Sequence, residues 1–336
     1  MGLNFYESPI HGQERTPGRD HLLNEARSLL VSYKEARKTG IPSALATVVR
    51  VTGSSYRQPG AKLLVTGTGE LTGSVSGGCL ERDLVRQALL AIENSTPALV
   101  RYDSRADADE AEWNLPVTTI GSGCEGIVEI FIDPDPVKHL AALESACVER
   151  KKGEHVLYLP DGSVFKDILS PPVPLFIFGA GPDAVPMARL AGEIGWETTV
   201  VDLRSSLPVP RRLFGKIARI VSCAPDQVAG RIEIGPDSVL FVMTHNYHHD
   251  LAVLRLVIDL PVLYLGLLGP RSRSEKLLSE LETATTGKKP LHFPMGLDIG
   301  GDTPQAVALS ALAEAQAVLN GKKGGFLALR KGSIHR

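Results

Sequence analysis

The chain has 336 residues, enough for two domains that each bury a sizeable apolar core. Hydrophobic residues make up 43% and charged residues 22%, and the formal net charge of -2 gives no basis for binding nucleic acid or an anionic membrane. No segment resembles a membrane helix or a signal peptide. Four cysteines without a CxxC pair indicate free thiols in a reducing compartment. We therefore predict a cytoplasmic protein without nucleic-acid or membrane partners.

The first half of the chain is predicted to form a mixed α+β domain. Residues 1–19 lack apolar periodicity and are expected to be a flexible tail. Residues 20–169 form the domain, with helices over 21–38, from about residue 80, and over 137–150. Asp161 and Gly162 should form the tip of a closing hairpin. Runs rich in β-branched residues predict strands at 43–51, 62–66, 99–102, 117–120 and 127–132.

The second half is predicted to be a Rossmann-like, doubly wound parallel-sheet domain over residues 175–320. A linker at 170–174 precedes it, because three prolines there resist regular structure. Apolar strands alternate with helices in this half. Residues 321–336 form a basic tail. The expected elements after the first strand, loop and helix unit are strands at 239–244 and 262–268, and helices at about 249–260, 271–283 and 304–320.

A dinucleotide fingerprint opens the second domain. Residues 179–184 (GAGPDA) follow a strand and match G-x-G-x-x-A. Gly179 should make the tight turn, Gly181 should let the backbone approach a pyrophosphate, and Asp202 should accept hydrogen bonds from ribose hydroxyls. Asp183, however, would repel a pyrophosphate at the start of the helix. The loop either binds a nucleotide-like group or survives only as a tight turn.

Residues 73–81 (GSVSGGCLE) are the most informative segment. The glycines and small side chains allow backbone N–H groups to converge on an anion such as phosphate. A helix follows, so Cys79 lies near a positive dipole end that favours the thiolate, the form that binds metals and carries sulfur. Cys124 lies in a second glycine turn, GSGCEG over 121–126. Each cysteine is either a functional thiol or a small residue in a tight turn.

Residues 244–250 (THNYHHD) follow a predicted strand, at the edge where open α/β sheets bind ligands. We expect His245 to face a ligand there. The histidines and Asp250 either hold a metal ion or are solvated, with Asn246 or Asp250 capping the next helix. Arg271 and Arg273, after the following strand, either bind phosphate or are ordinary surface arginines.

Several segments occur in an order that resembles the XdhC/CoxI family of xanthine dehydrogenase and carbon monoxide dehydrogenase accessory proteins. The resemblance extends from about residue 20 to about residue 320. It implies a maturation factor that binds the molybdenum cofactor, shelters it and delivers it to an apo molybdenum hydroxylase, without turnover of its own. The segments are GSVSGGCLE, the Cys124 turn, GAGPDA, VMTHNYHHDLAVL (242–254), YLGLLGPRSR (264–273) and GLDIGGDTPQAVALSALAEAQA (296–317).

The resemblance also implies the site and the partners. Cys79 and Cys124 fall on the two cysteine positions of the family, and Cys79 is the expected contact to the molybdenum centre. Expected partners are the apo-hydroxylase, a cysteine desulfurase and a second copy of the chain. The cofactor is either plain molybdopterin or its cytosine dinucleotide form. Together, the residues predicted to bind cofactor are Gly77, Gly78, Cys79, Glu81, Cys124, Gly179, Gly181, Asp202, His245 and Arg271.

An alternative is an NAD(P)-dependent oxidoreductase that uses the Rossmann-like domain. We favour it less, because spacing in the sequence gives His245 no acid–base partner for hydride transfer. A thiol redox or sulfur-carrier protein is a further alternative, but the sequence has no paired-thiol motif.

Overall fold

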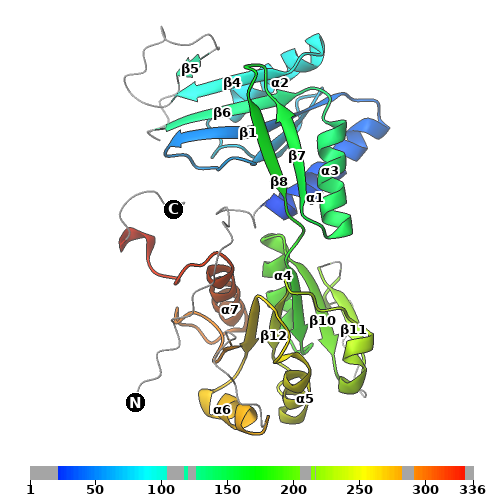
Figure 1. Cartoon of the computed structure of the whole chain (residues 1–336), viewed down its shortest axis with the longest axis vertical. Coiled ribbons are helices and arrows are strands. Elements are labelled where there is room, and N and C mark those ends of the chain that lie inside the picture. Colours follow the sequence, from blue (N-terminus) through cyan, green and yellow to red (C-terminus); the bar gives the residue numbers. More distant parts are fainter. Residues whose placement is uncertain are drawn as a thin grey trace. The chain divides into compact units, whose positions relative to one another are not determined.

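The computed structural model describes residues 22–103, 117–119, 126–204, 213–215, 217–281 and 291–329. The chain divides into two compact units between Pro172 and Val173 (Figure 1). Within the described residues, no helix is both long and apolar enough to cross a membrane.

The N-terminal unit is built on a six-stranded sheet of order β3-β2-β1-β6-β4-β5. Neighbouring strands are antiparallel except for the parallel pair β4 and β5. A separate hairpin, β7 and β8, turns at Asp161 and Gly162 as predicted. The elements are α1 (Leu22–Lys38), β1 (Ser43–Gly53), β2 (Lys62–Thr66), β3 (Leu71–Gly73), α2 (Glu81–Asn94), β4 (Ala98–Asp103), β5 (Val117–Thr119), β6 (Gly126–Asp133), α3 (Val137–Glu149), β7 (Gly153–Tyr158) and β8 (Val164–Leu169).

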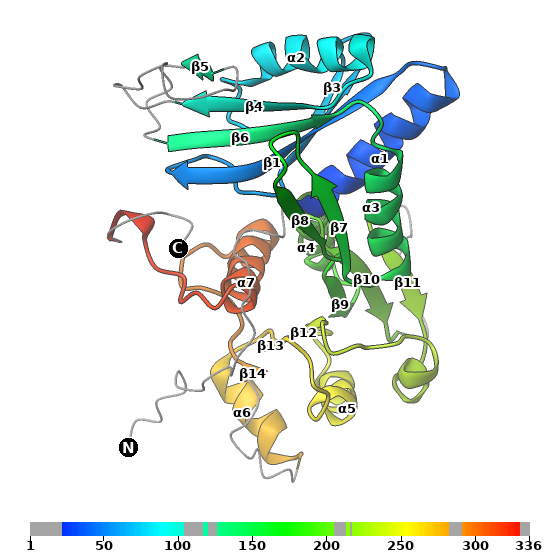
Figure 2. The same ribbon diagram turned by 45° about the horizontal axis from the view of Figure 1, so that its top comes forward.

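Helices cover both faces of this sheet, as Figure 2 shows. Alternate residues of β1 point to opposite faces: Ala46 and Val48 pack with Leu84 of α2, whereas Leu45 packs with α1 and α3. Burial on both faces explains why β1 reads as an almost continuous apolar run instead of alternating with polar residues.

A buried ionic cluster joins the hairpin to the sheet and to α3. Lys62 Nζ lies 2.6 Å from Asp167 Oδ2, and both side chains are almost fully buried. His139 Nε2 lies 2.8 Å from the same carboxylate oxygen, and its ring stacks on His155. Burial lowers the pKa of His139 to about 4, so the imidazole is neutral at pH 7 and donates from Nε2 to Asp167.

We predict that this histidine makes folding sensitive to mild acid. Its pKa is about 4 when folded and 6.5 when unfolded, so its stabilising contribution is complete above pH 6.5 and is lost as the pH falls toward 4. His139→Gln can still donate to Asp167 but does not titrate. Thermal melts between pH 7 and pH 5 should show a smaller loss of Tm for His139→Gln than for wild type. An equal loss of Tm in the two proteins between pH 7 and pH 5 would contradict a neutral, buried His139.

The C-terminal unit is the predicted doubly wound sheet, with order β11-β10-β9-β12-β13-β14 and parallel neighbours throughout. The order reverses between β9 and β12, whose carboxyl ends therefore define the switch point. The elements are β9 (Pro174–Phe178), α4 (Ala184–Glu193), β10 (Glu197–Asp202), β11 (Arg219–Ser222), a 3-10 helix (Pro225–Gly230), β12 (Val239–Val242), α5 (Tyr247–Val257), β13 (Tyr264–Leu267), α6 (Arg271–Ser279), β14 (Leu291–His292), α7 (Pro304–Leu319) and a 3-10 helix (Leu327–Leu329).

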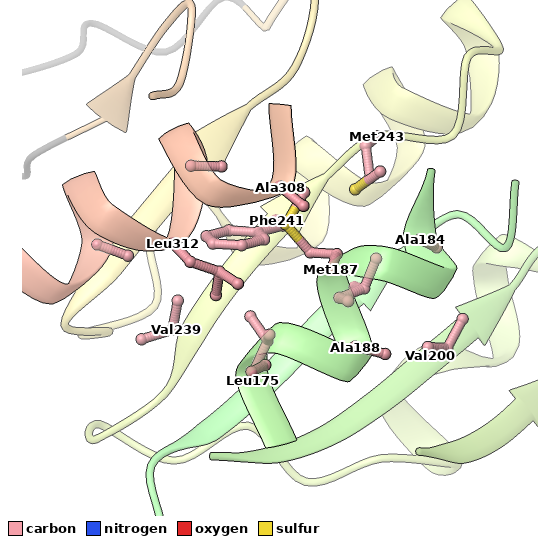
Figure 3. Packing of buried hydrophobic residues seen from close by; sticks show 14 of the residues in the cluster. Leu175, Ala184, Met187, Ala188, Val200, Val239, Phe241, Met243, Ala308 and Leu312 are labelled. Carbon is pink, nitrogen blue, oxygen red and sulfur yellow. The ribbon is translucent and has the colours of Figure 1, made fainter. Parts of the chain in front are cut away.

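Two apolar layers enclose this second sheet. On one face, Met187 of α4 and Leu312 of α7 pack around Phe241 and Leu175 of the strands (Figure 3). On the other face, α5 and α6 pack on the sheet, with Leu254 of α5 in the same buried cluster as the strand residues. The small residues of α4 and α7 allow the helices to lie close to the strands. Both faces are thus buried, and the loops at the strand ends remain available for binding.

Candidate functional site

The glycine–cysteine loop connects β3 to α2 and is organised around the carboxylate of Glu81, the first residue of α2. The Ser74 hydroxyl donates to Glu81 Oε1 at 3.0 Å, and the backbone N–H of Ser76 donates to the same oxygen at 3.2 Å. The other oxygen, Oε2, accepts from the Ser76 hydroxyl and, at 3.2 Å, from the backbone N–H of Leu80. The predicted anion nest is therefore filled by a carboxylate of the chain itself. Contact between Glu81 and a cofactor stays a prediction.

Three residues of this loop form an exposed crest, which we define as Gly77, Gly78 and Cys79. Ser76 and Leu80 on either side are buried, so the crest is anchored at both ends. Gly78 has a φ of +108°, and a Cβ placed there would meet no atom within 4 Å. The crest therefore presents the free Cys79 thiol to solvent beside open space.

Other loops leave the sheet at the same end as the crest. Strands β1 and β3 are both antiparallel to β2, so Gly53 and Gly73 end their strands in the same direction. Gly53 pairs with Gly126, the first residue of β6. Cys124, two residues before Gly126, lies outside the described residues. Its cofactor contact stays a prediction, although the strand order brings the start of β6 to this end of the sheet.

Tyr56 is a residue that the sequence analysis missed. It lies in the loop after β1 and is 67% exposed. Its ring lies 3.8 Å from the position that a Cβ of Gly77 would take, so it borders the crest. The signal available in the sequence was a lone aromatic residue in a polar turn between Gly53 and Gly60, which does not reveal the spatial neighbour.

We predict that Glu81 is required for the order of the crest. Burial raises the pKa of Glu81, but hydrogen bonds from Ser76 and Ser74 outweigh burial and hold the pKa below its ordinary value of 4.5. Its contribution to stability is therefore complete above pH 4.5 and is lost as the pH falls through the lower, folded-state pKa. Glu81→Ala leaves several donors unpaired and should destabilise the fold by about 1–3 kcal/mol at pH 7.

Denaturant melts measure this change, and Glu81→Gln is the matched variant, because it keeps one acceptor oxygen and does not ionise. Its free energy of unfolding at pH 7 should lie between those of wild type and Glu81→Ala, and it should lack the loss of stability in acid that protonation of Glu81 causes. Protease cleavage within the loop should rise in the order wild type, Glu81→Gln, Glu81→Ala. Unchanged stability in Glu81→Ala would show that the carboxylate does not organise the loop.

At the switch point of the C-terminal sheet, the chain's own packing requires the first fingerprint glycine, and the second lies against a side chain of the loop. Gly179 has a φ of +124°, and a Cβ there would collide with the carbonyl oxygen of Met243 after β12. A Cβ at Gly181 would lie 2.6 Å from Asp183 Oδ1. The carboxylate of Asp183 thus occupies space beside Gly181, where its charge disfavours a pyrophosphate.

Asp202, the last residue of β10, is also hydrogen-bonded within the chain. Asp202 is almost completely buried, and Arg204 Nε donates to its Oδ1 at 2.9 Å. The same arginine donates to the backbone oxygen of Ala180 in the glycine loop at 3.1 Å. A ribose hydroxyl would have to compete with Arg204 for Asp202, and ribose binding by Asp202 stays a prediction.

His245 follows β12 and pairs with Asp183, since its Nε2 lies 2.6 Å from Asp183 Oδ2. The imidazole is 62% exposed, and the residue has a φ of +58°, which is uncommon for a residue with a side chain. Spacing in the sequence indicates no acid–base partner for His245, and the structure supplies one, because Asp183 lies 62 residues away in the glycine loop. A carboxylate-oriented histidine at a switch point can bind or exchange a proton with a ligand.

The remaining polar residues at this edge have structural partners. Asn246 caps α5, because its side chain accepts hydrogen bonds from the backbone N–H groups of His248 and His249. Of the two candidate caps in the sequence, Asn246 and Asp250, the structure selects Asn246. Asp250 is buried, and its Oδ2 accepts from Arg273 Nη2 at 2.5 Å. Arg271 lies over the Phe293 ring, 5.5 Å from its centroid. Among the described residues, no group of three or more His, Cys, Asp or Glu could hold a metal ion.

The unusual backbone of His245 gives a direct test of this loop. Both His245→Gly and His245→Ala remove the pair with Asp183, but only alanine must place a Cβ at a positive φ. His245→Gly should therefore be about 1 kcal/mol more stable than His245→Ala in urea unfolding. If His245→Ala were as stable as His245→Gly, the left-handed conformation at this residue would be contradicted.

Comparison with known protein families gives two matches. The XdhC Rossmann domain matches residues 175–315, and the XdhC and CoxI family matches residues 36–103. A Bacillus subtilis protein, named as a probable subunit of xanthine dehydrogenase, is 30% identical, over 81% of this chain and 92% of its own length. The Escherichia coli protein named molybdenum cofactor insertion chaperone PaoD is 24% identical, over 95% of this chain and 96% of its own length.

A solved structure shows a similar fold. The crystal structure of a Bacillus halodurans protein described as a xanthine dehydrogenase has a TM-score of 0.74 and 27% sequence identity. The similarity covers 88% of this chain and 97% of that chain. It therefore includes both the N-terminal and the C-terminal unit.

Proposed function

We propose that this chain, which belongs to the XdhC and CoxI family, binds the molybdenum cofactor and inserts it into a molybdenum hydroxylase of the xanthine dehydrogenase type. The observation that carries the proposal is the free, exposed Cys79 thiol on an anchored glycine crest. The name of the Escherichia coli relative supports the same role.

The chemistry of the crest suits this cargo. The molybdenum centre of the cofactor is coordinated by sulfur, and soft thiolate ligands suit such metal–sulfur centres. Gly77 and Gly78 have no side chains to block approach to Cys79, and the space above Gly78 is open. Because Glu81 fixes the backbone on both sides of the crest before the cofactor arrives, less backbone entropy is lost on binding.

For the C-terminal unit, we propose that the switch point holds a phosphate-bearing part of a ligand. His245 and Arg271 are the candidate donors, and the ring of His245 lies close to Gly181 of the glycine loop. Plain molybdopterin carries a single phosphate, whereas the cytosine dinucleotide form carries a pyrophosphate, which the Asp183 carboxylate disfavours beside Gly181. This contact therefore suits the plain form better. The carboxylate of Asp183 beside Gly181 argues against a pyrophosphate bound as in NAD(P)-dependent oxidoreductases, and we do not adopt that alternative.

The partners follow from this role. A cofactor inserter must meet the apo-hydroxylase, and a sulfur donor such as a cysteine desulfurase would complete the cofactor while it is bound. We also propose a homodimer and a cytoplasmic location, where the Cys79 thiol would stay reduced.

Replacement of Cys79 tests the proposed function. Cys79→Ser keeps the size of the side chain, but a hydroxyl is barely ionised at pH 7 and is a poor ligand for a soft metal–sulfur centre. After expression together with the cofactor pathway, the variant should hold at least tenfold less molybdenum and pterin per chain than wild type. Its melting temperature should stay within a few degrees, because Cys79 is exposed.

Cys223→Ser is the matched control, since Cys223 is a half-buried thiol in the other unit. It should retain the wild-type content of molybdenum and pterin. Equal contents in wild type and Cys79→Ser would show that Cys79 does not hold the cofactor. A wild-type protein without molybdenum or pterin would overturn the proposed function as a whole.

A further inference from the structure

Tyr56 places an exposed aromatic ring beside the crest. It is 67% exposed, and its ring borders the crest at 3.8 Å from the Cβ position of Gly77. Along the crest, Gly77 and Gly78 separate this ring from the Cys79 thiol. Since neither glycine has a side chain, the crest between the ring and the backbone of Cys79 is bare.

The loop that carries Tyr56 is held by contacts of its neighbours. Arg57 makes two hydrogen bonds to the carboxylate of Glu25 in α1, at 2.8 and 2.6 Å. The Ser55 hydroxyl donates to the backbone oxygen of Arg57 at 2.8 Å. The carbonyl of Ser54 packs so closely on Gly126 that no Cβ would fit there. The backbone on both sides of Tyr56 is thus fixed, and the exposed ring is presented rather than used for the core.

We propose that Tyr56 is the stacking surface for the pterin ring of the cofactor, an inference that rests on the proposed function. A pterin is a flat, fused heteroaromatic system with polar edges, as are the nucleic-acid bases that proteins bind by stacking on aromatic side chains. The thiol of Cys79 would hold the metal–sulfur end. The ring of Tyr56 would cover one face of the pterin, and the bare glycine backbone would let the cofactor lie flat between them.

The experiment compares three variants with wild type, all expressed together with the cofactor pathway. Tyr56→Ala removes the ring, Tyr56→Phe keeps the ring without the hydroxyl, and Tyr158→Ala removes a tyrosine that is 78% exposed on β7 of the same unit. The measurement is the amount of pterin and molybdenum that stays with each chain during timed dialysis, beside a thermal melt.

Stacking predicts that Tyr56→Ala releases pterin about tenfold faster than wild type. Tyr56→Phe and Tyr158→Ala should retain pterin like wild type, and all melting temperatures should agree, because both tyrosines are exposed. Wild-type retention by Tyr56→Ala would overturn the inference and leave the proposed function intact. Equal losses in Tyr56→Phe and Tyr56→Ala would also overturn it, because the hydroxyl would then be the contact. If wild type itself holds no pterin, the proposed function fails first.

Discussion

The glycine–cysteine loop of the N-terminal unit depends on one local interaction, the binding of the Glu81 carboxylate by the loop that precedes it. A glycine-rich loop of this kind has many backbone N–H groups and few side chains, and buried donors without acceptors are destabilising. Glu81 provides the acceptor from within the chain, so the loop is ordered without an external anion. Ser76 and Leu80 can then be buried while Cys79 is exposed between them. An exposed thiol on a fixed backbone is the property that the proposed function requires.

In the C-terminal unit, both glycines of the nucleotide-binding fingerprint have close contacts within the chain. Gly179 permits the close approach of the β12 loop, and Gly181 leaves room for the side chain of Asp183. Asp183 orients His245, and Arg204 engages Asp202. The Rossmann-like fold is therefore intact, but the groups at its switch point differ from those that hold a dinucleotide pyrophosphate. A fold of this class does not by itself establish the ligand, and the particular side chains at the switch point must be considered.

The two units contribute different chemistry to the proposed role. The N-terminal unit offers a soft thiol and an aromatic ring, which suit a metal–sulfur centre and a flat heterocycle. The C-terminal unit offers a histidine paired with a carboxylate, and an arginine at the carboxyl edge of the sheet, which suit a polar or phosphate-bearing group. Of the relatives, one is named as a probable subunit of xanthine dehydrogenase and another as a molybdenum cofactor insertion chaperone.

The sequence alone determined the order and type of the main elements, the Rossmann-like second half and the family. These features depend on local periodicity, glycine and proline turns and short motifs, which can be recognised within a few adjacent residues. Only the tertiary structure decided that Asp183 is the partner of His245, that Lys62 pairs with Asp167, and that Tyr56 borders the crest. Each of these contacts joins segments that are remote in the chain, and strand order and loop geometry bring them together. Even for Glu81, the sequence suggested the nest but could not show that the nest closes on its own carboxylate, because that depends on how the first turn of α2 packs against the loop.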